Sequence, residues 1–175
     1  MSQLVDAIIA EWKDQPKKIA KKLISQYGAP DEITRERLVW NNKGPWKRSE
    51  LINEEIPHNF PDPHHDSLLQ AIPYQVPPER VSELLRFDGS VIVERTRGEL
   101  AARCDDERAN YLALNLVHEI LTNRMNVSQA RLFYAETVQQ KKHQEYMDGF
   151  MFRLPSGDQA DPDVEVEARK AATGR

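Results

Sequence analysis

The residues best able to do chemistry gather in one short segment, IPHNFPDPHHD, at residues 56–66. Imidazole and carboxylate groups are ligands that divalent transition metals take in proteins, and the same groups exchange protons in acid–base catalysis. The most economical metal site would combine His58 and His64 with one carboxylate, drawn from Asp62, Asp66, Glu54 or Glu55. Two prolines between the histidines stiffen the loop and lower the entropy cost of assembling the ligands. The metal site predicted from this spacing consists of His58, His64 and Asp66, with a divalent transition metal as the cofactor.

The same segment also has a purely structural interpretation. Asp62-Pro63 is typical of a helix start, with Asp as the N-cap and Pro in the first turn, and it predicts a short helix over about residues 63–72. On a helix, His64 and His65 would point about 100° apart and would be poorly placed to chelate one ion. The sequence has no HExxH motif, no paired CxxC motif and no EF-hand loop. A stiff, irregular connector over residues 53–66 is therefore favoured over a metal site, and acid–base chemistry without a metal is the third interpretation.

A second group of polar residues lies in DGSVIVERTRGELAARCD, residues 88–105. Its β-branched run and the turn at residues 96–98 predict a hairpin, closed by an ion pair between Arg95 and Glu99. Alternation along the strands would place several of these side chains on one surface, as a ladder of ion pairs or as a site for a small anionic ligand. The residues predicted for the anionic ligand are Arg95, Glu99, Arg103 and Asn110.

Cys104 is the only cysteine, so the chain forms no internal disulfide. An inert buried thiol is the default expectation for such a residue. A nucleophilic role would need a histidine close enough to produce the thiolate, and His118 is the histidine considered for that role.

Aromatic residues offer the third candidate surface. Trp40 and Trp46 flank the turn NNKGP, where they either stabilise a hairpin or form an exposed binding patch. The apolar run MDGFMF, residues 147–152, either folds back onto the core or docks on a partner protein or a second copy of the chain. The interaction surface predicted from these runs consists of Trp40, Trp46, Phe150 and Phe152.

The elements that must position these groups are predicted by periodicity and by capping signals. Amphipathic helices are expected over residues 4–13 and 16–27, 78–87, 106–121 and 126–138, and the turn NNKGP joins a first hairpin. Together they predict an α+β fold, a small antiparallel sheet of two hairpins with helices packed on one face. Residues 1–154 are expected to form a single domain, and residues 155–175, which lack apolar periodicity, a disordered tail.

Composition narrows the class of protein further. The 175 residues include 28 acidic and 24 basic side chains, a formal net charge of −4, and such a balance argues against a general nucleic-acid binder. Asp6 and Glu11 interrupt the apolar stretch at the start, so a signal peptide is not expected, and no window is apolar enough for a membrane span. We expect a cytoplasmic protein in a reducing compartment.

Several unusual motifs resemble those of a family of bacterial proteins for which no activity is known. The resemblance covers about residues 27–134. The motifs that carry it are YGAPDEIT, NNKGPWKR, IPHNFPDPH, Tyr74-Gln75-Val76-Pro77, FDGSVIVERTRGELAARCDDE and NYLALNL. It implies no residue role that could be carried over.

Three function classes are compatible with the sequence. The favoured one is a soluble, non-catalytic accessory or interaction module that binds a protein partner or forms a homodimer. The first alternative is a metal-dependent or acid–base enzyme that uses residues 58–66. The second alternative is a binder of a small anionic ligand.

Overall fold

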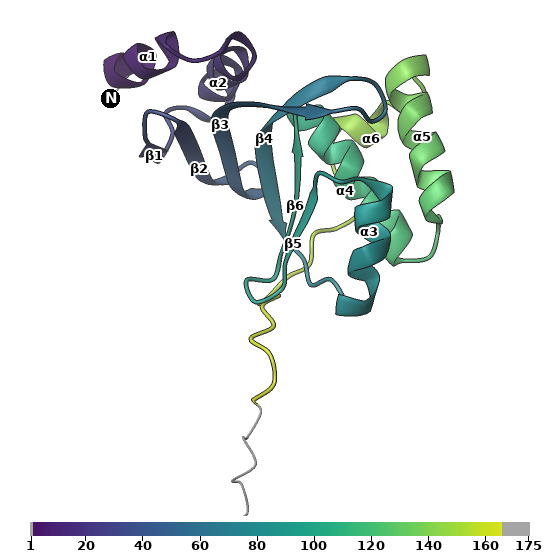
Figure 1. Cartoon of the computed structure of the whole chain (residues 1–175). Helices are drawn as coiled ribbons and strands as arrows, with labels where there is room; N and C mark the ends of the chain where they lie inside the picture. Colours follow the sequence, from purple (N-terminus) through teal and green to yellow (C-terminus); the bar gives the residue numbers. More distant parts are fainter. Residues whose placement is uncertain (1, 166–175) are drawn as a thin grey trace, which may run out of the picture.

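A computed structural model describes residues 2–165 of the chain, which form a six-stranded antiparallel sheet flanked by helices (Figure 1). The strand order across the sheet is β1-β2-β3-β4-β6-β5. The α+β class is thus confirmed. The strands are β1 (Glu32–Ile33), β2 (Arg37–Lys43), β3 (Trp46–His58), β4 (His64–Pro73), β5 (Val91–Glu94) and β6 (Glu99–Cys104). The helices are α1 (Ser2–Ala10), α2 (Asp14–Tyr27), the 3-10 helix η1 (Pro78–Arg80), α3 (Val81–Phe87), α4 (Glu107–Leu121), α5 (Val127–Gln140) and α6 (Glu145–Asp148).

Local capping residues set three of the helix ends. Gly28 ends α2 with a positive φ of 81°, a conformation that costs a residue without Cβ nothing. Asp106 caps α4 by accepting a hydrogen bond from the Arg108 amide. Asn126 and Gln129 form a complete capping box at the start of α5.

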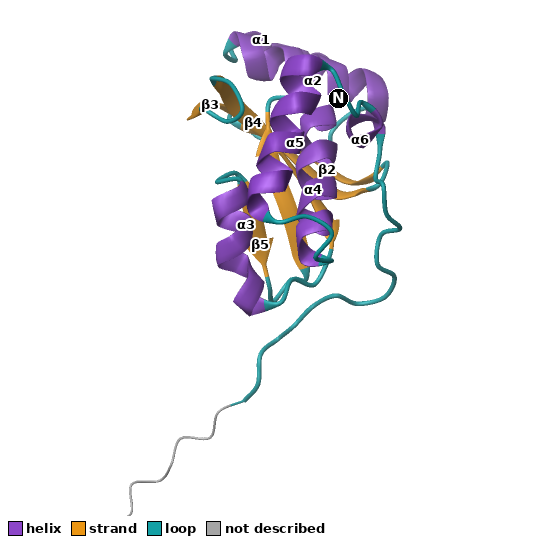
Figure 2. Cartoon of the chain, turned by 90° about the vertical axis from the view of Figure 1, so that its right-hand side faces the viewer, coloured by secondary structure: helices purple, strands orange, loops and turns teal. Residues whose placement is uncertain are grey.

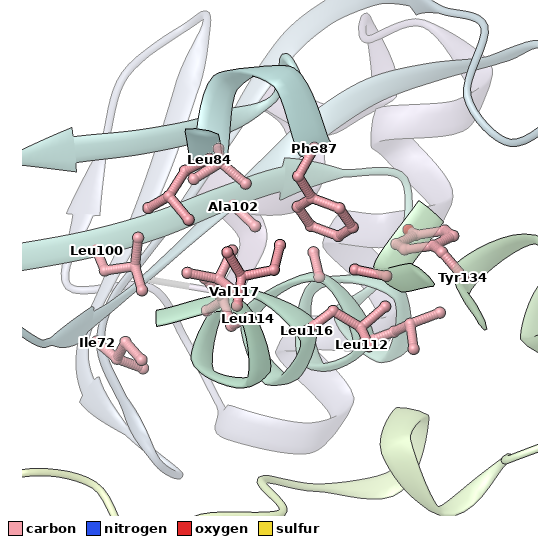
Figure 3. Packing of buried hydrophobic residues seen from close by; sticks show 14 of the residues in the cluster. Ile72, Leu84, Phe87, Leu100, Ala102, Leu112, Leu114, Leu116, Val117 and Tyr134 are labelled. Carbon is pink, nitrogen blue, oxygen red and sulfur yellow. The ribbon is translucent and has the colours of Figure 1, made fainter. Parts of the chain in front are cut away.

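The apolar faces of the helices cover one face of the sheet in two adjoining clusters. The first cluster packs α1 and α2 on β2, β3 and β4, and the second packs α3, α4 and α5 around β4 and β6 (Figure 3). Leu68 belongs to the first cluster and Ile72 to the second, and residues four apart on a strand point to the same side. Both clusters therefore lie on one face. Figure 2 shows α3, α4 and α5 in front of the strands.

Two predictions for this region are wrong. Residues 63–72 do not form a helix, and most of residues 53–66 belong to strands and not to an irregular connector. β3 continues to His58, and residues 64–73 form β4, which lies between β3 and β6. Residues 66–72 are all buried, although successive side chains of a strand point to opposite faces. A central strand gains backbone hydrogen bonds along both edges, and this tertiary pairing overrides the local Asp-Pro signal.

An irregularity in β3 changes which of its residues face the helices. Leu51 pairs with Leu68, whereas the next registered pair is Ile56 with Asp66, so β3 holds three extra residues there. The Ser67 hydroxyl donates a hydrogen bond to the Glu54 carbonyl within this bulge. An uninterrupted ladder would set residue 55 opposite residue 64. The bulge sets His58 there instead, so it decides which side chain faces His64.

The last described segment follows the sheet edge without regular secondary structure. Residues 155–165 run past the turn between β5 and β6, where the Arg95 guanidinium binds the Asp161 carboxylate at 2.8 Å. This part of the expected disordered tail is therefore held by specific contacts, and the remaining part, residues 166–175, lies outside the described residues. Among the helices that the structure describes, none is both long and apolar enough to cross a membrane.

Candidate metal centre

Three of the residues predicted from the sequence converge at the end of the β3–β4 ribbon. One ligand atom from each of His58, His64 and Asp66 lies within 4.8 Å of the others. His58 Nδ1 is 3.1 Å from Asp66 Oδ2, and His64 Nε2 is 3.1 Å from Asp66 Oδ1. The two imidazole rings lie with their centroids 4.8 Å apart, tilted by 51°. The carboxylate is almost fully buried at 3% exposure, and both histidines are half-buried.

Strand geometry explains the convergence. His58 and His64 are directly opposite each other in the antiparallel ladder, and opposite residues project to the same side. Asp66 is two residues after His64 on β4, so it shares that side as well. His65 points the other way and is exposed.

The tip of the ribbon is held by aromatic packing. Residues 59–63 join the two strands and include a cis Phe60–Pro61 peptide. The Phe60 ring packs against Tyr134 at 5.1 Å and Phe87 at 6.4 Å, and the Arg131 guanidinium lies 3.8 Å above it. This anchor between α3 and α5 fixes the loop, and with it the orientation of the two histidines.

Electrostatics couples the three groups strongly. Asp66 raises the pKa of His64 to about 9 through its hydrogen-bond contact, against the opposing effect of burial. Contact with the same carboxylate also raises the pKa of His58 above its ordinary value. Burial alone would raise the pKa of Asp66, but the two histidines outweigh it and hold the pKa below its usual range. In the metal-free protein Asp66 is therefore a carboxylate beside at least one imidazolium.

The hydrogen-bond geometry at the centre is incomplete despite these short distances. Four buried side-chain polar atoms among the described residues have no hydrogen-bond partner of acceptable angle, and two of them are His58 Nδ1 and Asp66 Oδ1. Each of these two atoms has an ion-pair contact of 3.1 Å but no hydrogen bond, so the centre can accept a further partner. A cation between the three side chains would satisfy both atoms.

The outer nitrogen of each histidine faces an oxygen atom of another residue. His64 Nδ1 lies 2.8 Å from the Asp62 carbonyl, so a proton on Nδ1 leaves the Nε2 lone pair pointing at Asp66. His58 Nε2 lies 3.5 Å from Asp88 Oδ1, and Asp88 is only 2% exposed. A carbonyl or carboxylate behind the ligating ring is the arrangement that orients metal-bound histidines. Sequence reasoning missed Asp88, which lies thirty residues along the chain and has no spacing signal.

Cys104 lies next to this cluster rather than next to His118. Its Sγ is 3.6 Å from His64 Nε2 and 3.5 Å from Asp105 Oδ1. A Cys–His–Asp triad would have the carboxylate behind the histidine, on the nitrogen that faces away from the thiol. Here Asp66 and Cys104 approach the same nitrogen, and burial with nearby carboxylates raises the pKa of the thiol. The geometry does not support a nucleophilic cysteine in the metal-free protein.

His118 has a structural environment. Its ring stacks on Phe152 at 4.0 Å with an interplanar angle of 4°, and its Nδ1 is 2.9 Å from the Tyr74 hydroxyl. Burial lowers the pKa of His118, which favours the neutral ring. The residue helps to hold the segment after α6 against α4.

The four residues predicted to bind an anion do not converge. Arg95 binds the tail at Asp161, and the pair with Glu99 is wrong because Glu99 stands opposite Glu94. The buried carboxylate of Glu99 is instead neutralised by Lys47 at 3.1 Å and Arg48 at 2.9 Å. Asn110 is fully buried under β4, where its amide donates to the Leu68 carbonyl, and strand alternation directs Arg103 to the face opposite the helices.

The four aromatic residues predicted to form an interaction surface do not form an exposed patch. Trp40 and Trp46 are 0% and 1% exposed, because the helices cover the face of β2 and β3 to which they point. Phe150 packs edge-on against Trp46 at 5.2 Å, so the run MDGFMF folds back onto the core. These four residues stabilise the fold and offer no aromatic patch to a partner.

Comparison of the chain with protein-family models, with curated proteins and with solved structures gave no match. The function is therefore argued from the geometry of the centre.

Proposed function

We propose that this protein binds one divalent transition-metal ion through His58, His64 and Asp66. The observation that carries the proposal is the convergence of two imidazoles and one buried carboxylate with ligand atoms within 4.8 Å, combined with two buried atoms there that make no hydrogen bond. Exposed acidic clusters are common without a metal, but here the carboxylate is buried, the histidines are half-buried, and both rings have outer contacts behind them.

The donor set favours a particular class of metal. Two imidazoles and a carboxylate are typical of zinc and iron(II) sites, whereas magnesium and calcium prefer sites built from oxygen alone. The ion would join the two strands at the end of the β3–β4 ribbon, and so hold the loop at residues 59–63 against α3 and α5. In this proposal the metal has a structural role, and the protein is an accessory protein of the bacterial cytosol.

Metal titration of the untagged, chelator-treated protein tests the proposal. We expect one equivalent of Zn²⁺ or Co²⁺ to bind in isothermal titration calorimetry. A free metal concentration a hundred times the Kd should stabilise the fold by about 2.7 kcal/mol, and so raise Tm by roughly 5–11 °C for a chain of this size. The double variant His58→Ala, His64→Ala should lose both effects.

His65→Ala is the matched control. It removes a histidine from the same segment, but that side chain is exposed on the opposite side of β4. It should bind metal like the wild type. Circular dichroism of each metal-free variant establishes that the fold is retained. Absence of binding by the wild type, or equal binding by the folded double variant, would refute the site.

A further inference from the structure

We infer that Cys104 is the fourth protein ligand of this centre, which makes it a closed site of two histidines, one aspartate and one cysteine. The inference rests on the proposed metal site. It adds a fourth ligand to that site and states which metals the complete set of ligands prefers. It concerns a residue that local sequence spacing does not connect with the histidines.

The sheet brings Cys104 to the centre. Cys104 ends β6 and pairs in register with Leu68, two residues beyond Asp66 on the neighbouring strand. The side chain points to the helix-covered face and is 5% exposed. Its Sγ stands 3.6 Å from His64 Nε2, the nitrogen that the proposed ion would bind.

The separation of Cys104 Sγ from His64 Nε2 suits a tetrahedral ion. Binding would also have to draw Sγ toward the other ligands, because the group of ligand atoms within 4.8 Å of one another consists of His58, His64 and Asp66. Zinc–nitrogen bonds of about 2.0–2.1 Å and zinc–sulfur bonds of about 2.3 Å, set at tetrahedral angles, separate the two ligand atoms by about 3.5 Å. The observed separation of Sγ and Nε2 is 3.6 Å. For a nitrogen and an oxygen ligand the same geometry gives about 3.4 Å. The two contacts of Asp66, each 3.1 Å, would open by a few tenths of an ångström.

A second observation points independently to a ligand at this place. Asp66 is only 3% exposed to solvent. Its Oδ1 lies 3.1 Å from His64 Nε2 and makes no hydrogen bond. On the other side of the same carboxylate, His58 Nδ1 makes an ion-pair contact of 3.1 Å but no hydrogen bond. The buried Asp66 oxygen without a hydrogen bond therefore faces the same His64 nitrogen that Cys104 approaches.

A thiolate ligand would also change the charge of the centre. A divalent ion bound by two neutral imidazoles and one carboxylate keeps one net positive charge, which the nearby carboxylates of Asp88 and Asp105 offset in part. A coordinated thiolate adds one negative charge to this balance, because metal binding displaces the thiol proton. Four protein ligands leave no open position for a substrate or water, so the closed site is structural. A thiolate ligand also selects zinc or cobalt over magnesium, calcium and manganese.

Cobalt spectroscopy of the full chain tests the inference, because Co²⁺ takes zinc sites and reports sulfur coordination. Wild-type protein loaded with one equivalent of Co²⁺ should show a near-ultraviolet sulfur-to-cobalt charge-transfer band, and His65→Ala should show the same band. Cys104→Ser should lose the band and bind Co²⁺ at least about tenfold more weakly, the lower end of what loss of a supporting contact costs. The wild-type spectrum alone is decisive should the variant fail to fold.

The outcomes separate this inference from the proposed function. One equivalent of Co²⁺ bound by the wild type without the band would overturn the role of Cys104 and leave the site of His58, His64 and Asp66 standing. No Co²⁺ bound by the wild type would overturn both. A band that persists in folded Cys104→Ser would also count against the inference, since Cys104 is the only cysteine.

Discussion

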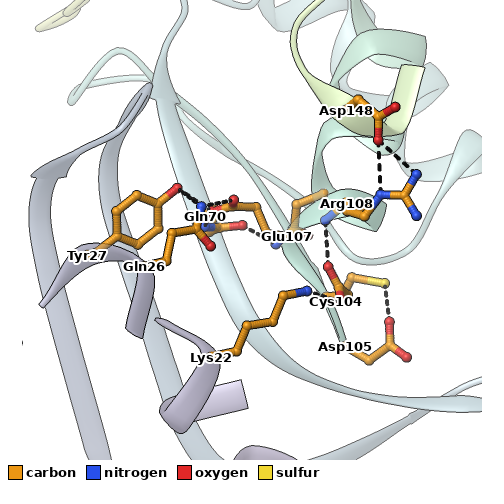
Figure 4. Close-up of polar contacts among 11 residues, drawn as sticks. Lys22, Gln26, Tyr27, Gln70, Cys104, Asp105, Glu107, Arg108 and Asp148 are labelled. Carbon is orange, nitrogen blue, oxygen red and sulfur yellow. Dashed lines mark hydrogen bonds and ion pairs between the residues drawn. The ribbon is translucent and has the colours of Figure 1, made fainter. Parts of the chain in front are cut away.

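The carboxylate of Glu107 is a meeting point for four elements, and its replacement by alanine should destabilise the fold strongly. Glu107 is 7% exposed at the start of α4. Its Oε2 accepts a hydrogen bond of 2.8 Å from Trp46 Nε1. The same oxygen accepts bonds of 2.8 Å from Gln70 Nε2 and the Tyr27 hydroxyl, and Oε1 accepts one of 2.8 Å from Gln26 Nε2; Figure 4 shows these residues around Glu107. These bonds tie α2, β3 and β4 to α4.

The magnitude follows from the donors that would lose their partner. Gln26 is exposed and Tyr27 is half-buried, so both can bond to water after the change. Trp46 and Gln70 are 1% and 0% exposed, and only Gln70 has another acceptor, the Ser49 hydroxyl at 3.1 Å. Hydrogen bonds to a charged group contribute about 1.5–3 kcal/mol each, so two buried ones give roughly 3–6 kcal/mol, and the cost of burying the carboxylate reduces this figure. We therefore expect a loss of about 3–5 kcal/mol, the range typical of removing one partner from a buried charged contact. That is a large share of the roughly 5–15 kcal/mol typical of a domain.

Urea unfolding followed by tryptophan fluorescence and by circular dichroism measures this difference. Glu136→Ala is the control, because Glu136 is also in a helix but pairs with side chains near the surface, Lys142 at 3.2 Å and His143 at 4.0 Å. A surface pair of this kind contributes about 0–1 kcal/mol. Were Glu107→Ala to lose no more free energy of unfolding than Glu136→Ala, with an unchanged m-value, the structural argument would be refuted.

Three further predictions follow from other parts of the molecule. Asp88→Asn should weaken zinc binding by about 10- to 100-fold at unchanged stoichiometry, because it weakens the contact behind a ligating ring; competition with a chelator measures it. In the metal-free protein the pKa of His64 is raised to about 9, so its ion pair stabilises the fold fully below the unfolded pKa of about 6.5 and loses this effect as pH rises through 9. Urea melts across that range should show the loss, and a ring titrating near 6.5 in NMR spectra would contradict it. Gly98→Ala should release the tail, seen as faster hydrogen exchange over residues 155–165, because φ is +60° and a Cβ would collide with the Gln159 backbone. Gly89→Ala, where nothing lies within 4 Å of the added Cβ, should leave that exchange unchanged.

Local signals in the sequence predicted most of the helices and both hairpins. The apolar stripes of α2 and α4, the positive-φ Gly28 and the capping box at Asn126 all act within one or two turns of the chain. Such features depend on neighbours only a few residues away, so periodicity and capping reveal them. The site residues His58, His64 and Asp66 were also named from the sequence, on the basis of residue type and proximity along the chain.

The sequence misled wherever a distant element decided the outcome. The Asp-Pro step at residues 62–63 is a valid helix signal, yet residues 64–73 form a strand because β3 and β6 pair with it on both sides. Trp40 and Trp46 looked available for binding because nothing local shows that the helices cover them. Asp88 and Cys104 escaped notice as neighbours of the histidines because Asp88 lies thirty residues after His58 and Cys104 lies forty residues after His64.

The sequence by itself determined the kinds of group present: imidazoles, carboxylates and one thiol, close to prolines that limit the loop. Only the tertiary structure decided that they meet. Two strands must pair so that His58 stands opposite His64, a bulge must shift β3 by three residues, and β6 must bring Cys104 alongside. The physical reason is that strand register depends on hydrogen bonds and packing between segments far apart in the chain, whereas residue type and local periodicity do not.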